Sequence, residues 1–122
     1  MTTKTSDTNP TDNDPDLSPT EIFSLLSNER RRYALHYLSS RVGAIPIGEV
    51  AEQIAIWEGD PTMDRYQRVY VGLIHNHLSR LGHAGVIAYD SDEELITTTD
   101  GIDAVRPYLE LAACVDMSRL NG

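Results

Sequence analysis

A long helical repeat followed at once by two short strands restricts the folds open to this chain more than any other feature. Between residues 62 and 81, hydrophobic side chains recur at the helical period without a break. They are Tyr66, Val69, Tyr70, Leu73, Ile74, Leu78 and Leu81. Gly82 stands where a left-handed residue would end this helix. Residues 86–89 and 95–99 flank a polar turn, and this pattern predicts a β-hairpin directly after the long helix.

Three shorter helices are predicted before the long one. Ser18 and Glu21 form a capping-box pattern around Pro19, which suits a first helical position. A second helix begins at Ser27 or Asn28 and ends near Ser40, and a third covers residues 48–57. Between them, residues 45–47 are predicted to form only an edge strand, because Pro46 cannot donate a ladder hydrogen bond.

The order of these elements predicts a mainly α chain with a small β-hairpin, an α+β fold of the winged helix-turn-helix type. We expect one domain over residues 17–115, which includes a C-terminal helix over residues 100–115 that Pro107 bends. Residues 1–16 contain no large apolar residue apart from Met1, so they are predicted to form a disordered acidic tail that solvates the chain or has a function of its own. Residues 116–122 are predicted to form a flexible C-terminus.

Charge is distributed unevenly along the chain. Nineteen acidic residues against ten basic ones give a net charge of −9, which ordinarily disfavours binding to nucleic acid. Molar salt, however, would screen such repulsion to within a few ångströms. Residues 17–41 carry four Arg and two acids, and residues 62–81 carry three Arg and one acid, so each segment is +2. The basic segments therefore coincide with the helices that a helix-turn-helix protein turns towards DNA.

The predicted long helix has a polar stripe opposite its apolar face. The stripe consists of Arg65, Arg68, Gly72, His75 and Ser79, with Gln67, Asn76 and Arg80 at its flanks. Arginine can pair with guanine, and glutamine or asparagine with adenine, so the stripe is predicted to read bases in DNA. The alternative is the solvated face that any exposed helix needs.

Arg30 and Arg32 lie at the start of the second helix, where positive charge opposes the helix dipole. Contact with DNA phosphate would compensate this cost, and so would pairing with acidic residues of the chain. Both interpretations stay open at the level of the sequence.

No catalytic site, metal or cofactor is predicted. His75 and His77 are two residues apart and would point about 200° apart on a helix, so we expect one inside and one outside. Cys114 is the only cysteine and lies in an apolar run, which favours a buried hydrophobic role. The sequence contains no nucleophile elbow and no phosphate-binding glycine loop, so we expect a protein that is not an enzyme.

No apolar run approaches the roughly 20 residues of a membrane span, and the first ten residues do not have the pattern of a signal peptide. We therefore expect a cytoplasmic protein without a membrane partner.

Several segments of this chain resemble a family of small haloarchaeal winged helix-turn-helix proteins of unknown function, which are presumed to be transcriptional regulators. The resemblance rests on residues 74–81 (IHNHLSRL), 84–87 (AGVI), Tyr89-Asp90 and 25–32 (LLSNERRR), and it covers residues 17–112. Members often carry proline where this chain has Ser79. The resemblance implies a salt-adapted cytoplasm, which agrees with the ratio of nine Arg to one Lys.

These observations together predict a sequence-specific transcriptional regulator that places the helix 62–81 in the major groove of double-stranded DNA. A homodimer joined by the helix 100–115 would supply two half-sites, although the same helix could instead pack on the second helix of its own chain. The alternative function is a protein–protein interaction module of winged-helix fold with an acidic wing. It arises because Asp90, Asp92, Glu93 and Glu94 place four acids at the hairpin tip, which DNA would repel.

Overall fold

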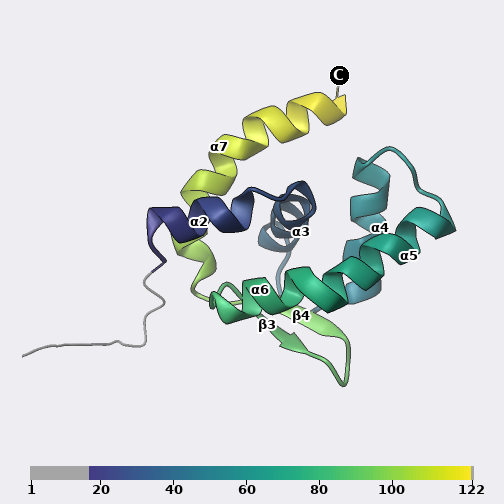
Figure 1. Ribbon diagram of the computed structural model, residues 1–122, viewed down its shortest axis with the longest axis horizontal. Helices are drawn as coiled ribbons and strands as arrows, with labels where there is room; N and C mark the ends of the chain where they lie inside the picture. Colours follow the sequence, from purple (N-terminus) through teal and green to yellow (C-terminus); the bar gives the residue numbers. More distant parts are fainter. Residues whose placement is uncertain (1–16, 122) are drawn as a thin grey trace, which may run out of the picture.

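The computed structural model describes residues 17–121, so the predicted N-terminal tail lies outside the described residues. As predicted, the chain is mainly helical with a small antiparallel sheet (Figure 1). The helices are α2 (Pro19–Leu26), α3 (Glu29–Ser39), α4 (Ile47–Trp57), α5 (Met63–Gly72), the π-helical turn η2 (Leu73–His77), α6 (Leu78–His83) and α7 (Ile102–Asn121). The strands are β2 (Ile45–Pro46), β3 (Ile87–Asp90) and β4 (Leu95–Thr98).

Side-chain caps start α2, α3 and α5. Ser18 Oγ accepts a hydrogen bond from the backbone N–H of Glu21, and the Glu21 carboxylate accepts one from the N–H of Ser18. At α3 and α5 the cap is one-sided: the side chains of Asn28 and Thr62 accept hydrogen bonds from the backbone N–H groups of Arg31 and Arg65. These caps satisfy backbone donors that have no partner within the helix.

The sheet has the strand order β2-β4-β3, and all its pairs are antiparallel. β2 is only two residues long and lies at an edge, as expected for a strand that contains Pro46. Ile45 pairs with Ile96 of β4, and both side chains are buried in the core. The sheet thus connects the segment after α3 to the hairpin.

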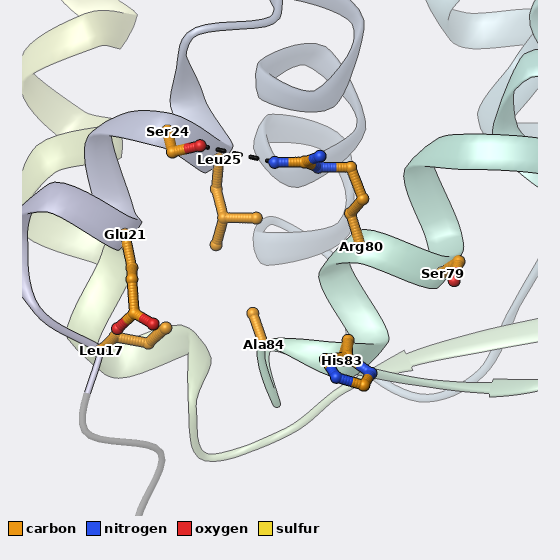
Figure 2. Close-up of a pocket in the computed structure, with 8 residues that line it drawn as sticks. All are labelled: Leu17, Glu21, Ser24, Leu25, Ser79, Arg80, His83 and Ala84. Atoms are coloured by element: carbon orange, nitrogen blue, oxygen red, sulfur yellow. Dashed lines mark hydrogen bonds between the residues drawn. The ribbon is translucent and has the colours of Figure 1, made fainter.

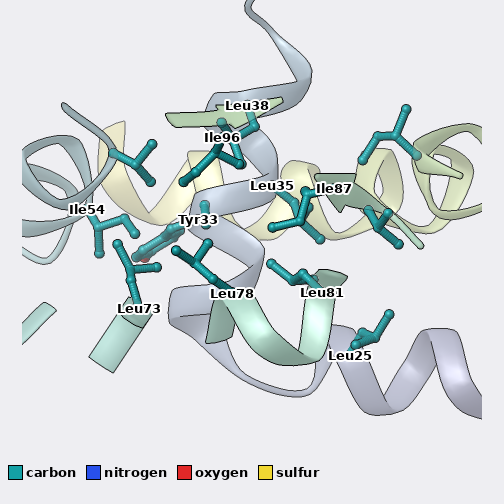
Figure 3. Packing of buried hydrophobic residues seen from close by; sticks show 14 of the residues in the cluster. Leu25, Tyr33, Leu35, Leu38, Ile54, Leu73, Leu78, Leu81, Ile87 and Ile96 are labelled. Carbon is teal, nitrogen blue, oxygen red and sulfur yellow. The ribbon is translucent and has the colours of Figure 1, made fainter. Parts of the chain in front are cut away.

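The core lies around α3. Leu35 and Leu38 are at most 1% exposed, and they meet Leu78 and Leu81 of the long helix together with Ile96 of the sheet (Figure 3). The helices α2 and α7 pack on α3 as well. None of the helices over residues 17–121 is both long and apolar enough to cross a membrane.

The predicted long helix is present but irregular. The π-helical turn η2 joins α5 to α6, and a π turn holds one residue more than an α-helical turn. The residues after it are therefore rotated by about 100° relative to an uninterrupted α-helix. A regular period cannot describe both halves of this helix at once.

The end of this helix also differs from the prediction. Gly82 lies inside α6, so its assignment as the left-handed stop was wrong. The left-handed residue is Gly85, with φ +80°. The N–H of Gly85 donates to the Gly82 carbonyl over 3.0 Å, and that of Val86 donates to the Leu81 carbonyl over 3.1 Å. This pair of hydrogen bonds is a Schellman motif. The left-handed position that favours glycine is therefore Gly85, three residues after Gly82.

The C-terminal helix is longer than predicted. It includes Pro107 and continues through residues 116–121, which we expected to be flexible. Asp116 is buried at 3% exposure and paired, which the local sequence does not reveal. Cys114 is exposed rather than buried, because α7 turns Ile102, Val105 and Leu109 towards the core.

Candidate nucleic-acid interface

The outward surface of the long helix after Asp64, which we call the α5–α6 face, carries no acidic side chain. Its exposed residues are Gln67, Arg68, Val71, His75, Asn76, Ser79, Arg80 and His83. No Asp or Glu occurs between residues 65 and 83, although the whole chain contains nineteen. The π turn keeps Val71, His75, Ser79 and His83 in one row at a spacing of four residues.

The predicted polar stripe is only partly on this face. Gln67, Arg68, His75, Asn76 and Ser79 are exposed there, as predicted. Arg65 and Gly72 are turned aside and only partly exposed. A Cβ on Gly72 would lie 3.9 Å from the ring of His77. The stripe predicted for a straight helix is therefore interrupted at Arg65 and Gly72, while Arg68, His75 and Ser79 remain exposed.

Arg65 belongs to an ion-pair network with Arg30 and Glu58. Arg30 donates from Nε to Glu58 Oε2 over 2.6 Å, and Arg65 donates from Nη1 to Glu58 Oε1 over 2.8 Å. The Glu58 side chain is 8% exposed. Burial alone would raise the pKa of Glu58, but the hydrogen bonds from both arginines outweigh burial and lower this pKa. Arg65 also lies 3.4 Å from the carboxylate of Asp60. Both guanidiniums are thus bound to carboxylates of the chain itself.

Arg32, two residues after Arg30 in α3, binds the C-terminal helix instead. It donates to Asp116 over 2.8 and 3.2 Å and to the carbonyl of Leu26 over 2.8 Å. His36 Nε2 lies 3.1 Å from the same carboxylate. Arg32 thus joins α3 to α7 and to the end of α2. For both Arg30 and Arg32, pairing with acids is the interpretation that the structure supports.

Arg31 and His77 form a buried pair that sequence reasoning missed. Arg31 is 6% exposed and donates to the carbonyls of Leu25 and Ser24, at the end of α2. Burial, followed by the positive charge of Arg31, lowers the pKa of His77. His77 is buried and His75 is exposed, which confirms the expectation of one histidine inside and one outside.

Two arginines of the α5–α6 face remain accessible. Arg68 contacts Asp64 over 3.0 Å, but their side chains are 68% and 74% exposed, and such a surface pair contributes only about 0.3–0.5 kcal/mol. Arg80 donates to Ser24 Oγ over 3.4 Å and has no ion pair within residues 17–118 (Figure 2). His83 and Arg80 both line a shallow pocket between α2 and α6. The sequence placed Arg80 only at a flank and did not single out His83, because the π turn that aligns His83 cannot be read from the repeat.

The hairpin carries acids close to this face. Asp90 Oδ1 accepts hydrogen bonds from the N–H groups of Asp92 and Glu93, and Glu94 adopts a left-handed conformation with φ +56°. The hydroxyl of Tyr70 donates to the Glu94 carboxylate, and this bond raises the pKa of Tyr70 to about 12. The bond ties the turn of the hairpin to α5, while Asp92 and Glu93 of the same turn remain exposed.

Metal chemistry finds no support in the described part of the chain, where no three His, Cys, Asp or Glu residues are grouped as metal ligands. A family model described as a domain of unknown function, DUF7344, matches residues 23–97. The match covers more than half of the chain and includes α3, α4, the long helix and most of the hairpin. No curated protein and no solved structure matches the chain.

Proposed function

The chain belongs to DUF7344, a domain family of unknown function, and we propose from its geometry that it is a sequence-specific DNA-binding transcriptional regulator. We further propose that it is a winged helix-turn-helix protein acting in the cytoplasm of a salt-adapted cell. The helix formed by α5, η2 and α6 would lie in the major groove of double-stranded DNA.

The topology supports the winged-helix assignment. A winged helix has a three-helix core with a two-stranded wing after its last helix. Here α3, α4 and the long helix supply the three helices, and β3 and β4 follow directly. β2 lies between the first two of these helices and pairs with β4, so the sheet packs against the helical core.

The observation that carries the DNA-binding proposal is the acid-free α5–α6 face. In a chain of net charge −9, nineteen consecutive residues without an acid leave Arg68, Arg80 and His83 facing outwards. Other arginines in the described chain, such as Arg30 and Arg32, are bound to carboxylates and are less available to phosphate. Each phosphate contact requires a cation, and this face is where accessible cations gather.

The proposed contacts follow from side-chain chemistry. Gln67, Arg68, His75, Asn76 and Ser79 would meet base edges or nearby phosphates, and Arg80 and His83 would meet phosphates at the end of the helix. We leave Arg30, Arg32 and Arg65 out of the contact set, since carboxylates hold all three.

The wing takes no part in this binding. Asp92 and Glu93 are exposed at the hairpin tip and would be repelled by phosphate. The long helix therefore supplies the base contacts alone.

Selection from a library of random duplexes tests this proposal, with fluorescence anisotropy to measure affinity. The double substitution of Arg68 and Arg80 by alanine should weaken binding. It should also make the negative slope of log K against log salt shallower by about 2, because each phosphate contact contributes roughly 0.9 to its magnitude. The matched control is Arg106→Ala, which removes a partly exposed arginine of α7 whose single ion pair within residues 17–118 is with Asp103 over 3.7 Å. If no duplex is enriched and none binds at low salt, the proposed function is wrong.

A homodimer remains part of the proposal, with a broader surface than the helix 100–115 alone. Phe23, Leu111 and Val115 are 58%, 72% and 60% exposed, and Phe23 packs edge-to-face on Tyr108 at a centroid distance of 5.4 Å. Pairing of two copies here would supply two DNA half-sites. Light scattering tests this state, and Leu111→Glu should give a monomer with weaker DNA binding. A wild-type monomer at high concentration would remove the dimer but not the DNA site.

The second candidate function is a protein–protein interaction module with an acidic wing. The observations in its favour are the neutralised Arg65 and the exposed acids Asp92 and Glu93. This alternative predicts no duplex binding at any salt concentration. Neutralisation of the wing by Asp92→Asn and Glu93→Gln would then not produce DNA binding either. If the DNA proposal is right, the same two substitutions should tighten binding.

A further inference from the structure

Val71 is an exposed apolar side chain on the otherwise polar α5–α6 face. It is 53% exposed, and Arg68 and His75, about one helical turn to either side, are polar and exposed too. Val69 and Leu73 already supply the buried side of the helix at this level, both at 0% exposure. The core therefore does not require an apolar side chain at position 71.

A shallow surface depression lies beside Val71. It is lined mainly by apolar atoms of Tyr66, Gln67, Tyr70 and Val71. The rings of Tyr66 and Tyr70 lie at a centroid distance of 5.9 Å. Because Glu94 in the turn of the hairpin accepts a hydrogen bond from the Tyr70 hydroxyl, this ring is fixed in place. The depression thus has a rigid apolar wall and a single amide at its border.

Gln67 supplies that amide, one helical turn before Val71. Side chains at positions i and i+4 are about 5–6 Å apart on a helix surface, which corresponds to one or two base-pair steps of about 3.4 Å each. A glutamine amide can pair with N6 and N7 of adenine, and an apolar side chain can contact the C5 methyl group of thymine. Both features belong to A·T pairs in the major groove.

We propose that Gln67 and Val71 select A·T pairs, with the depression at Val71 receiving a thymine methyl group and the Gln67 amide pairing with adenine. This inference rests on the proposed DNA-binding function and adds the base composition that the face reads. A G·C pair suits the depression less well, because cytosine has no C5 methyl group and would turn its N4 donor towards an apolar wall.

Replacement of thymine by uracil tests the inference, since uracil lacks only the methyl group. The probe is the tightest duplex from the random-library selection, prepared with thymine or with uracil at each position in turn. The full-length wild-type chain should bind about three- to fivefold more weakly for each contacted thymine that is replaced, as expected when one methyl group leaves an apolar contact. Val71→Ala should bind the thymine duplex more weakly and lose the difference between the two bases.

Val42→Ala is the matched control, because Val42 is also an exposed valine, at 99%, but lies outside the α5–α6 face. It should keep the thymine preference of the wild type. The inference is overturned if the wild type binds both duplexes equally, or if Val71→Ala keeps the preference, while duplex binding itself leaves the proposed function intact. A complete absence of duplex binding would overturn both.

Discussion

The guanidinium of Arg31 lies 3.4 Å from Nδ1 of His77, and this contact joins α3 to the π-helical turn. A guanidinium can only donate, so Nδ1 must accept, and the ring is neutral with its proton on Nε2. The lowered pKa of His77 agrees with this state, since burial and then the charge of Arg31 both oppose protonation. A neutral histidine thus supports the irregular turn that aligns the α5–α6 face.

Protonation of His77 should therefore destabilise the fold. The pKa of His77 in the folded chain lies below its unfolded value of about 6.5, so the unfolded chain binds more protons as the pH falls through this range. We expect the melting temperature to fall progressively below about pH 6.5. His77→Gln keeps an acceptor for Arg31 and removes the titration, so its melting temperature should vary less between pH 7.5 and 5.5, a window chosen around that reference value. The exposed His75→Gln serves as control and should keep the wild-type profile.

The two glycines at the end of the long helix should respond in opposite ways to alanine. Gly82 is helical, and a Cβ there would have only an ordinary contact, 3.9 Å from the Ile87 carbonyl oxygen. Gly82→Ala should stabilise the chain by up to about 1 kcal/mol. Gly85 has φ +80°, so Gly85→Ala should cost roughly 1 kcal/mol or more. Urea denaturation of both variants measures the difference. If Gly82→Ala destabilised the chain more than Gly85→Ala, Gly82 would be the left-handed residue that ends the helix.

Features that depend on neighbours in the sequence were predictable. Ser18, Asn28 and Thr62 cap helices because their side chains accept hydrogen bonds from backbone N–H groups three residues ahead. The hairpin follows from two short apolar segments around a polar turn. In each case the energetic cause lies within a few residues, where a single sequence displays it.

Features that depend on residues distant in the sequence could not be predicted. The π turn inserts one residue into a repeat whose apolar positions also fit a straight helix, so His83 could not be aligned with Val71. The partners of Arg30 and Arg32 lie 28 and 84 residues away, at Glu58 and Asp116. Charge counts by segment cannot reveal such pairings, and the basic start of α3 was therefore open to a DNA interpretation.

The buried carboxylate of Asp116 should make the end of α7 important for stability. Its side chain is 3% exposed and receives hydrogen bonds from Arg32. Asp116→Ala would leave the partly buried guanidinium of Arg32 without its carboxylate. Breaking a fully buried pair typically costs about 3–5 kcal/mol, and the cost should be lower here because the Arg32 side chain is 19% exposed. Thermal unfolding should show a large loss for Asp116→Ala and none for Glu110→Gln, an exposed acid of the same helix. Equal stability of the two variants would mean that Asp116 does not hold the end of α7, in agreement with the flexible C-terminus predicted from the sequence.

Arg65 and Arg68 are three residues apart and should separate structure from binding. Arg65 pairs with the buried Glu58, so Arg65→Ala should lower the melting temperature, whereas Arg68→Ala should leave it unchanged because its pair with Asp64 is exposed. In anisotropy measurements at a temperature where both variants are folded, Arg68→Ala should lose about tenfold or more in duplex affinity. Arg65→Ala should stay close to the wild type. A matching loss of affinity in folded Arg65→Ala would show that DNA draws this side chain away from Glu58, because only a guanidinium released from its carboxylate can offer its full charge to a phosphate.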